Sequence, residues 1–253
     1  MLLTMLSHAI GEFTVEGQMY IEQLHTADLH VHTTISDGHS SPEEVIAFTL
    51  AHTSVTMIAI TDHDQIHGAK RAAVAAAGTR LQVIIGEEVS SRDGHILAYF
   101  VHERIAPGMS TRDTIRAIHE QGGLAVCAHP YDWMVRSCGR AGLLRRASGP
   151  DAEWQFDAIE TLNASLRPRA ANTQAAAAAS LLGLPMVGGS DSHCVTTIGY
   201  GYTNFVGTTC EDLRAAIAQH RTTAAGQHWS WGDMAEAGAK LLTRTLNPWA
   251  VRA

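Results

Sequence analysis

Short apolar runs alternate with amphipathic stretches along most of this chain, from Thr26 onward. The apolar runs have the length and the β-branched content that are typical of strands, and they cover residues 27–31, 55–60, 81–85, 95–101, 124–128, 158–161 and 186–187. The stretches between them begin or end at capping residues and predict helices over residues 42–52, 68–77, 110–121, 168–182 and 210–220. Repeated strand–helix units of this size favour parallel strands, either in a barrel or in an open doubly wound sheet.

Three segments do not follow this alternation. In residues 1–25, apolar and polar positions alternate around Gly17, which predicts a hairpin-like appendage that covers one end of the domain or forms a homo-oligomer contact with a second subunit. Residues 131–154 are arginine-rich and fit neither period, as expected of a lid or an insertion. We therefore expect one barrel domain over residues 26–225 and a C-terminal tail, residues 226–253, that packs on it.

Composition narrows the class of protein. The hydrophobic content of 45% in 253 residues is enough for a sizeable core and excludes a disordered chain. The 18 Lys and Arg against 25 Asp and Glu give a net charge of −7, which argues against a broad basic surface for long duplexes. The four cysteines form no CxxC pair and are most simply reduced thiols, and no apolar run approaches the roughly 20 residues of a membrane helix. No basic segment precedes the apolar start, so we expect no secretory signal, no membrane partner and a cytoplasmic location.

The 15 histidines are the unusual feature, because several of them stand at the ends of predicted strands. His30 and His32 are two apart on one strand and therefore face the same side. Further Asp, Glu and His residues follow the next strands, at the carboxyl ends where α/β folds bind ligands. Together they exceed the roughly four ligands of one zinc ion. The pattern predicts two or three divalent ions bridged by a carboxylate, with Glu88 as the central candidate, and paired ions suit phosphate-ester hydrolysis.

The ordered motifs DLHVHT, SDG, TDHD, GEEVS, GHILAYF, AHPYD and GSDSH resemble those of the polymerase and histidinol phosphatase (PHP) family, from Asp28 to Thr203. The resemblance implies an α/β fold, a distorted (βα)7 barrel with a metal site at the C-terminal ends of the strands. It also implies a trinuclear centre of Mn, Zn or Fe. The activity that it implies is that of the small stand-alone phosphoesterases of the family, which act on nucleotides or short oligonucleotides.

The resemblance also implies a metal ligand set, position by position. One ion is assigned His30, His32 and Asp191, a second His95 and His129, a third Asp37, His63 and His193, and Glu88 is the bridge. Related members can carry histidine where this chain has Asp37, so the metal preference of the third site stays open.

Acid–base and substrate-binding residues are further candidates. Asp64 is placed to orient a ligand or to move a proton, and His193 is the second candidate for protonating the leaving alcohol. A guanidinium fits phosphate geometry. Arg167 and Arg169, just after the sixth predicted strand, and Arg136, on the predicted lid, are therefore candidates for binding the substrate's phosphate.

These residues predict a metal-dependent phosphoesterase that acts on nucleotide or bisphosphate-type phosphomonoesters by attack of a metal-bound hydroxide. Short single-stranded oligonucleotides are a close variant of this small phosphorylated substrate. Two alternatives stay open: a hydrolase of a cyclic amide or a lactone on the same metal platform, and a non-catalytic metal-binding module.

Overall fold

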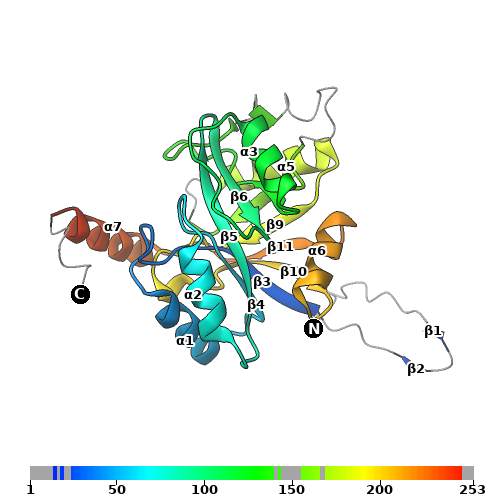
Figure 1. Ribbon diagram of the computed structural model, residues 1–253, viewed down its shortest axis with the longest axis horizontal. Helices are drawn as coiled ribbons and strands as arrows, with labels where there is room; N and C mark the ends of the chain where they lie inside the picture. The colour runs from blue at the N-terminus through cyan, green and yellow to red at the C-terminus, as the bar shows by residue number, and fades with distance from the viewer. Residues whose placement is uncertain are drawn as a thin grey trace, which may run out of the picture.

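A nine-stranded sheet forms the centre of the computed structural model, which describes residues 14–15, 18–19, 24–139, 142–143, 155–165 and 169–246 (Figure 1). Its strands are β3 (Leu24–Val31), β4 (Met57–Ile60), β5 (Gln82–Ser91), β6 (Gly94–Tyr99), β7 (Leu124–Cys127), β8 (Ala158–Asn163), β9 (Met186–Gly189), β10 (Gly201–Val206) and β11 (Thr223–Gly226). Their order in the sheet is β11-β10-β3-β4-β5-β6-β7-β8-β9.

The sheet curls into a nearly closed barrel. β9 is an edge strand in the order above, yet Ser192, just beyond it, forms a parallel bridge with Val31 of β3. The interior is one apolar cluster to which nearly every strand contributes, with Leu29, Tyr99 and Phe205 among its largest side chains. The expected α/β class and distorted barrel are therefore confirmed, although the sheet has more strands than a (βα)7 barrel.

Strand direction departs from the expectation of an all-parallel sheet. β6 runs antiparallel to both β5 and β7, and β10 runs antiparallel to β3 and β11. The cause at β6 is the connection from β5, where only Arg92 and Asp93 separate the two strands. A link this short can join antiparallel strands, whereas a parallel pair needs a crossover of a dozen or more residues.

The five predicted helices form close to their predicted bounds, and a further helix over Trp231–Leu246 was not predicted. The helices are α1 (Pro42–His52), α2 (His67–Ala76), α3 (Thr111–Glu120), α5 (Ala170–Leu182), α6 (Cys210–Ala218) and α7 (Trp231–Leu246). α1 begins at a capping box, in which Ser41 accepts from the backbone of Glu44 and the Glu44 side chain accepts from Ser41. α5 ends at Gly183 in the left-handed conformation, with φ 62°. Local capping chemistry is thus sufficient to set these ends.

The helices pack in separate groups on the outside of the barrel. α1 and α2 share one apolar cluster with β4, while α3 and α5 belong to another with β6 and β7, and the two groups lie apart in Figure 1. α5 approaches its cluster closely because Ala175 and Ala179 face it. The alanine-rich run of α5 thus has a packing role.

The two ends of the described chain differ in how they meet the barrel. β1 (Thr14–Val15) and β2 (Gln18–Met19) pair antiparallel within the predicted hairpin. Near the other end, Trp229 is buried and its indole Nε1 donates to the carbonyl oxygen of Ser190, 3.1 Å away. α7 then points away from the sheet in Figure 1, with Trp231 73% exposed. Among the residues that the structure describes, no helix combines the length and apolar character needed to cross a membrane.

Candidate metal centre

The predicted metal ligands come together at the edge of the barrel where the parallel strands end. The ligands at or just beyond the strand ends are His30 and His32 for β3, His63 for β4, Glu88 for β5, His129 for β7, and Asp191 and His193 for β9, while Asp37 lies in the turn after β3. His95 reaches the same edge by another route, because it stands at the start of the antiparallel β6, paired with Ser90 of β5.

Glu88 lies at the centre of this ligand cluster and is buried. Its two carboxylate oxygens face different imidazoles. Oε2 lies 3.1 Å from His30 Nε2, 3.3 Å from His32 Nε2 and 3.4 Å from His63 Nδ1, while Oε1 lies 2.9 Å from both His95 Nδ1 and His129 Nε2. A carboxylate that bridges two cations presents one oxygen to each, so this orientation fits the bridging position.

Two further carboxylates complete the cluster. Asp191 Oδ1 lies 3.4 Å from His30 Nε2 and 3.3 Å from His32 Nε2, on the side of Glu88 Oε2. Asp37 Oδ2 lies 3.1 Å from His193 Nε2 and 3.8 Å from His63 Nε2. His193 Nδ1 faces the carbonyl oxygen of Asp191 at 3.0 Å, so its Nδ1–H donates there and the lone pair of Nε2 faces Asp37 Oδ2.

The donor atoms fit divalent metal ions. Both ring nitrogens of His32, and Nδ1 of His63 and of His95, are buried without a hydrogen-bond partner, an arrangement that is costly unless something else binds them. Four overlapping groups have ligand atoms within 4.8 Å of one another: His30–His32–Asp191, His30–Glu88–His129, His32–Asp37–His63 and His63–Glu88–His95. Imidazole nitrogens with carboxylate oxygens are the donor set of zinc and related metals.

Burial and charge shift the pKa values of the cluster in opposite directions. Burial alone would lower the pKa of His32, but Asp191 and Glu88 outweigh it and raise the pKa to about 10. Burial alone would also lower the pKa of His129, but Glu88 outweighs it and raises the pKa to about 9. The surrounding imidazoles hold the pKa values of Glu88 and Asp191 well below their usual range despite burial. Metal binding must therefore displace protons from the imidazoles.

Asp64 and the neighbouring Asp62 have separate partners. Asp64 lies beside His63, and its Oδ1 accepts from the backbone amide of Ser90 at 2.8 Å. Its backbone has φ 54°, the left-handed region that aspartate tolerates better than most residues. Asp62 accepts from the amide and hydroxyl of Thr33 and from the Ser36 hydroxyl, each at 2.7 Å, so it holds the turn that carries the Asp37 ligand.

The structure describes two of the three candidate arginines, Arg136 and Arg169. The exposed Arg136 donates from Nη2 to the carbonyl oxygen of Arg92 at 3.1 Å, while its own carbonyl accepts from the amide of His95. Arg169 is exposed and directly precedes α5. Arg167 lies outside the described residues. A cation that the sequence pattern did not indicate, Arg104, donates from Nε to the carbonyl oxygen of Asp64.

Sequence reasoning also missed Glu160 and Asn163 of β8, which lie directly behind the ligands. Glu160 is 1% exposed and Asn163 is fully buried. The available signal was a charged and an amide side chain in the segment AIETLN, which was predicted as a strand over residues 158–161, since such groups are rarely buried without a partner.

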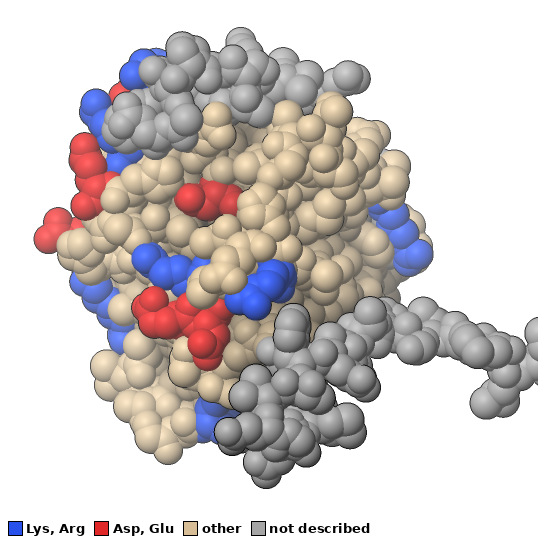
Figure 2. All heavy atoms as spheres, turned by 90° about the vertical axis from the view of Figure 1, so that its right-hand side faces the viewer, with Lys and Arg blue, Asp and Glu red and all other residues tan. Residues whose placement is uncertain are grey.

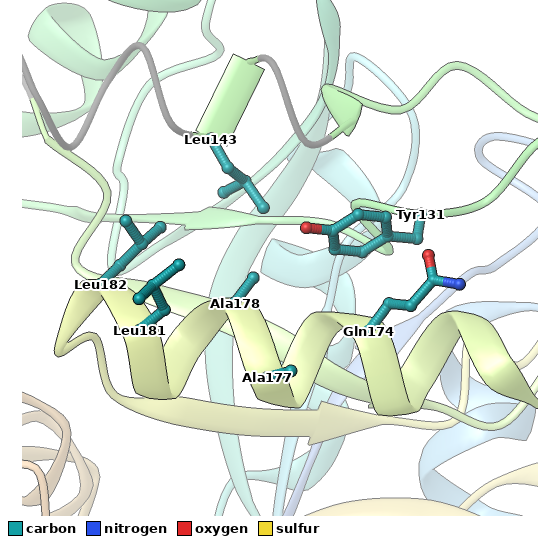
Figure 3. A pocket seen from close by; sticks show the side chains of 7 residues that line it. All are labelled: Tyr131, Leu143, Gln174, Ala177, Ala178, Leu181 and Leu182. Atoms are coloured by element: carbon teal, nitrogen blue, oxygen red, sulfur yellow. The ribbon is translucent and has the colours of Figure 1, made fainter.

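An apolar pocket of about 290 Å³ lies near the centre, between α5 and the segment that follows His129 (Figure 3). Tyr131, Leu143 and Leu182 are among its lining residues, and Figure 3 shows their side chains around it. None of its lining residues is a predicted metal ligand.

Comparison with known proteins gives relatives for different parts of the chain. A family model described as PHP-associated matches residues 169–222. An uncharacterised protein of Methanocaldococcus jannaschii is 32% identical over 124 residues, which cover 45% of this chain and 72% of the relative. A 5′-3′ exoribonuclease of Haemophilus influenzae is 41% identical over 64 residues, which cover 25% of this chain and 23% of that enzyme.

Solved structures share the fold over most of the chain. One is a two-domain protein of Bacteroides vulgatus, described as containing a predicted PHP-like metal-dependent phosphoesterase, with a TM-score of 0.68 at 17% identity over 88% of this chain and 70% of that chain. Another is endonuclease Q bound to a 27-mer duplex with an abasic lesion, with a TM-score of 0.56 at 12% identity over 87% of this chain and 72% of that chain.

The site and the comparisons agree on the class of protein. The donor set fits divalent metal ions, and the barrel is shared with a protein described as PHP-like and metal-dependent. The family model matches residues 169–222, which include α5, β9, β10 and α6, and the Methanocaldococcus relative matches 45% of this chain. The chain belongs to the PHP family of metal-dependent phosphoesterases.

Proposed function

We propose that this protein hydrolyses small phosphate esters, of which nucleotide and bisphosphate-type phosphomonoesters are the preferred class. The observation that carries the proposal is the position of Glu88, with one oxygen facing three imidazoles and the other facing two. A bridging carboxylate of this kind serves a pair of ions, and paired ions are suited to in-line displacement at phosphorus.

Each predicted ligand has a proposed place in the centre. We assign His30, His32 and Asp191 to one ion, His95 and His129 to a second, Asp37, His63 and His193 to a third, and Glu88 to the bridge. Two or three ions of Mn, Zn or Fe bound there would activate a water molecule and hold the phosphoryl oxygens. With their protons displaced by the metal, the imidazoles of this set would serve as neutral ligands fixed in direction.

Proton transfer to the leaving alcohol is proposed for Asp64. It is half-buried beside His63, and the amide of Ser90 binds only one of its oxygens in the hydrogen bond given above. His193 is the second candidate. Its Nε2 faces Asp37 and its Nδ1 faces a backbone carbonyl, so both ring nitrogens already have partners. The geometry therefore favours Asp64 for this role.

The arginines around the centre are proposed to bind the substrate's phosphate. Arg104 stands closest to the candidate acid, through its hydrogen bond to Asp64. Arg136 and Arg169 are exposed, and Arg167 stays a prediction from sequence. A guanidinium in these places would add contacts to phosphate oxygens that face away from the ions.

Small substrates are favoured over long duplexes. The net charge is −7, and the face shown in Figure 2 carries acidic and basic side chains side by side, without a continuous basic track. Similarity to an exoribonuclease makes short single-stranded oligonucleotides the close variant. Cytoplasmic location and contact between subunits through the N-terminal hairpin stay predictions from the sequence.

The test is hydrolysis by protein stripped with a chelator and reloaded with Mn²⁺. The panel contains nucleoside monophosphates, a nucleoside 3′,5′-bisphosphate, a phosphodiester, a short oligonucleotide, a cyclic amide and a lactone. Metal-dependent release of phosphate from the monoesters is the expected result. Turnover of only the amide or the lactone would favour the alternative hydrolase, and metal binding without any turnover would favour a non-catalytic module.

A further inference from the structure

Glu160 is buried behind the ligands and contacts two of them. Its Oε1 lies 2.9 Å from Nδ1 of His30, and its Oε2 accepts from the backbone amide of His129 at 2.8 Å. His30 comes from β3 and His129 follows β7, so one carboxylate of β8 connects ligands from two other strands.

The contact with His30 sets which ring nitrogen carries the proton. A neutral imidazole has one N–H and one lone pair. Because Glu160 is an acceptor on the Nδ1 side, the N–H is held there, and the lone pair of Nε2 points at Glu88 and Asp191. This is the tautomer that a metal ligand at Nε2 requires.

Asn163 extends the contact to a third ligand. Its Nδ2 donates to Oε2 of Glu160 at 3.2 Å and to Oδ2 of Asp191 at 3.1 Å. The amide cannot be turned around, because its Oδ1 already accepts from the backbone amide of Ser165 at 3.0 Å and from the Ser165 hydroxyl at 2.8 Å. The backbone of Asn163 is itself held by the side chain of Asn172.

The carboxylate of Glu160 is buried without a permanently charged partner among the described residues. Within the described part of the chain, its ion-pair partner is His30 and no Lys or Arg is paired with it. A buried carboxylate is costly unless it is paired. Ions held by His30 and His129 would supply the compensating positive charge through those ligands.

We propose that Glu160 and Asn163 form a positioning unit that holds His30, His129 and Asp191 in the orientation needed for metal binding, with the His30 ring in the tautomer that leaves Nε2 to the metal. The proposal rests on the proposed metal centre, and it concerns how tightly the ions are held. Neither residue touches substrate, so both act through the ligands.

Glu160→Gln separates this role from simple packing, because it keeps the shape and changes the hydrogen bonding. If the new NH₂ faces His30, it donates to Nδ1 and moves the ring proton to Nε2, where it blocks the metal. If the NH₂ faces the backbone amide of His129, two N–H donors face each other and the hydrogen bond to that amide is lost. Either orientation should weaken the binding of Mn²⁺ by about 10–100-fold.

The experiment is calorimetric titration of the stripped full-length protein with Mn²⁺, together with the visible spectrum of the Co²⁺-loaded protein, which reports ligand geometry. The matched control is Glu87→Gln, because Glu87 is also buried but its two oxygens accept only from the amide of Ile105, at 3.2 and 3.1 Å. We expect weaker Mn²⁺ binding and an altered Co²⁺ spectrum for Glu160→Gln, and parental values for Glu87→Gln.

Parental Mn²⁺ affinity and Co²⁺ spectrum in a folded Glu160→Gln protein would overturn the proposal. If that variant does not fold, Asn163→Ala takes its place. We expect weaker Mn²⁺ binding for it, and parental Mn²⁺ binding would again overturn the proposal. A parent protein that binds no Mn²⁺ would instead refute the metal centre itself, so the two failures are distinguishable.

Discussion

Glu88 and Glu87 are adjacent on β5, and replacing each by glutamine should have very different consequences. Successive residues of a strand point to opposite faces, and here Glu88 faces the imidazoles while Glu87 faces the amide of Ile105. Glu88→Gln removes the charge that both oxygens present to the ligand cluster. Glu87→Gln removes a carboxyl that burial, and then the charge of Asp64, already bring to a pKa of about 7.

The structure allows a rough magnitude for each change. Removing one partner from a buried charged group costs about 3–5 kcal/mol, and 1.4 kcal/mol corresponds to about a factor of ten. We therefore expect Glu88→Gln to lower kcat/KM for a phosphomonoester by about two to three and a half orders of magnitude. Glu87 is about half protonated near neutral pH, so an amide is a close substitute there, and activity should stay within about threefold of the parent.

The assay is phosphate release from a nucleoside monophosphate by both variants, with the metal content of each measured by elemental analysis. Circular dichroism and the melting temperature establish that each variant is folded. Equal losses of kcat/KM in two folded variants would show that the assignment of Glu88 as the bridging residue is wrong.

Three further predictions concern the metals, the substrate phosphate and the turn that carries Asp37. Protein produced with excess Mn²⁺ should hold more than one equivalent of metal and lose hydrolysis on chelation, whereas one ion or none by elemental analysis would contradict the bridged centre. Arg167→Ala or Arg169→Ala should raise KM for a phosphomonoester with unchanged metal content. Kinetics equal to the parent's in both variants would show that other arginines bind the phosphate. Gly68→Ala would place a Cβ 1.9 Å from Asp62 Oδ2 and should destabilise the protein by about 1–3 kcal/mol; Gly238→Ala, with open space around it, is the control in thermal melts.

Local sequence was sufficient to predict most of the helices and strands. The helix ends follow from short-range chemistry, as at the capping box of Ser41 and the left-handed Gly183. The strands that carry ligands were visible because apolar runs lead directly into histidines and carboxylates. The strands β10 and β11 and the helix α7 were not predicted. For the short β11 the reason is that a four-residue run of small residues has no distinctive period.

Period-two spacing and strand ends are local properties, so they marked candidate ligands in the chain, and the resemblance to the PHP family assigned those candidates to ions. His30 and His32 share a face wherever the strand lies in the sheet. What the pattern could not say is which side chains meet across the barrel. The convergence of five imidazoles on Glu88 depends on contacts between β3, β4, β5, β6 and β7, which no single segment encodes.

Tertiary structure alone decided two features of the centre. His95 reaches Glu88 because β6 reverses direction after a two-residue connection, which brings the start of that strand to the edge where its neighbours end. Glu160 supports His30 and His129 because barrel closure sets β8 behind them, although it is distant from both in sequence. The sequence by itself determined which residues could bind metal, because donor chemistry belongs to each side chain. The pairing of strands determined how these residues are oriented and held, because orientation depends on neighbours that only folding brings together.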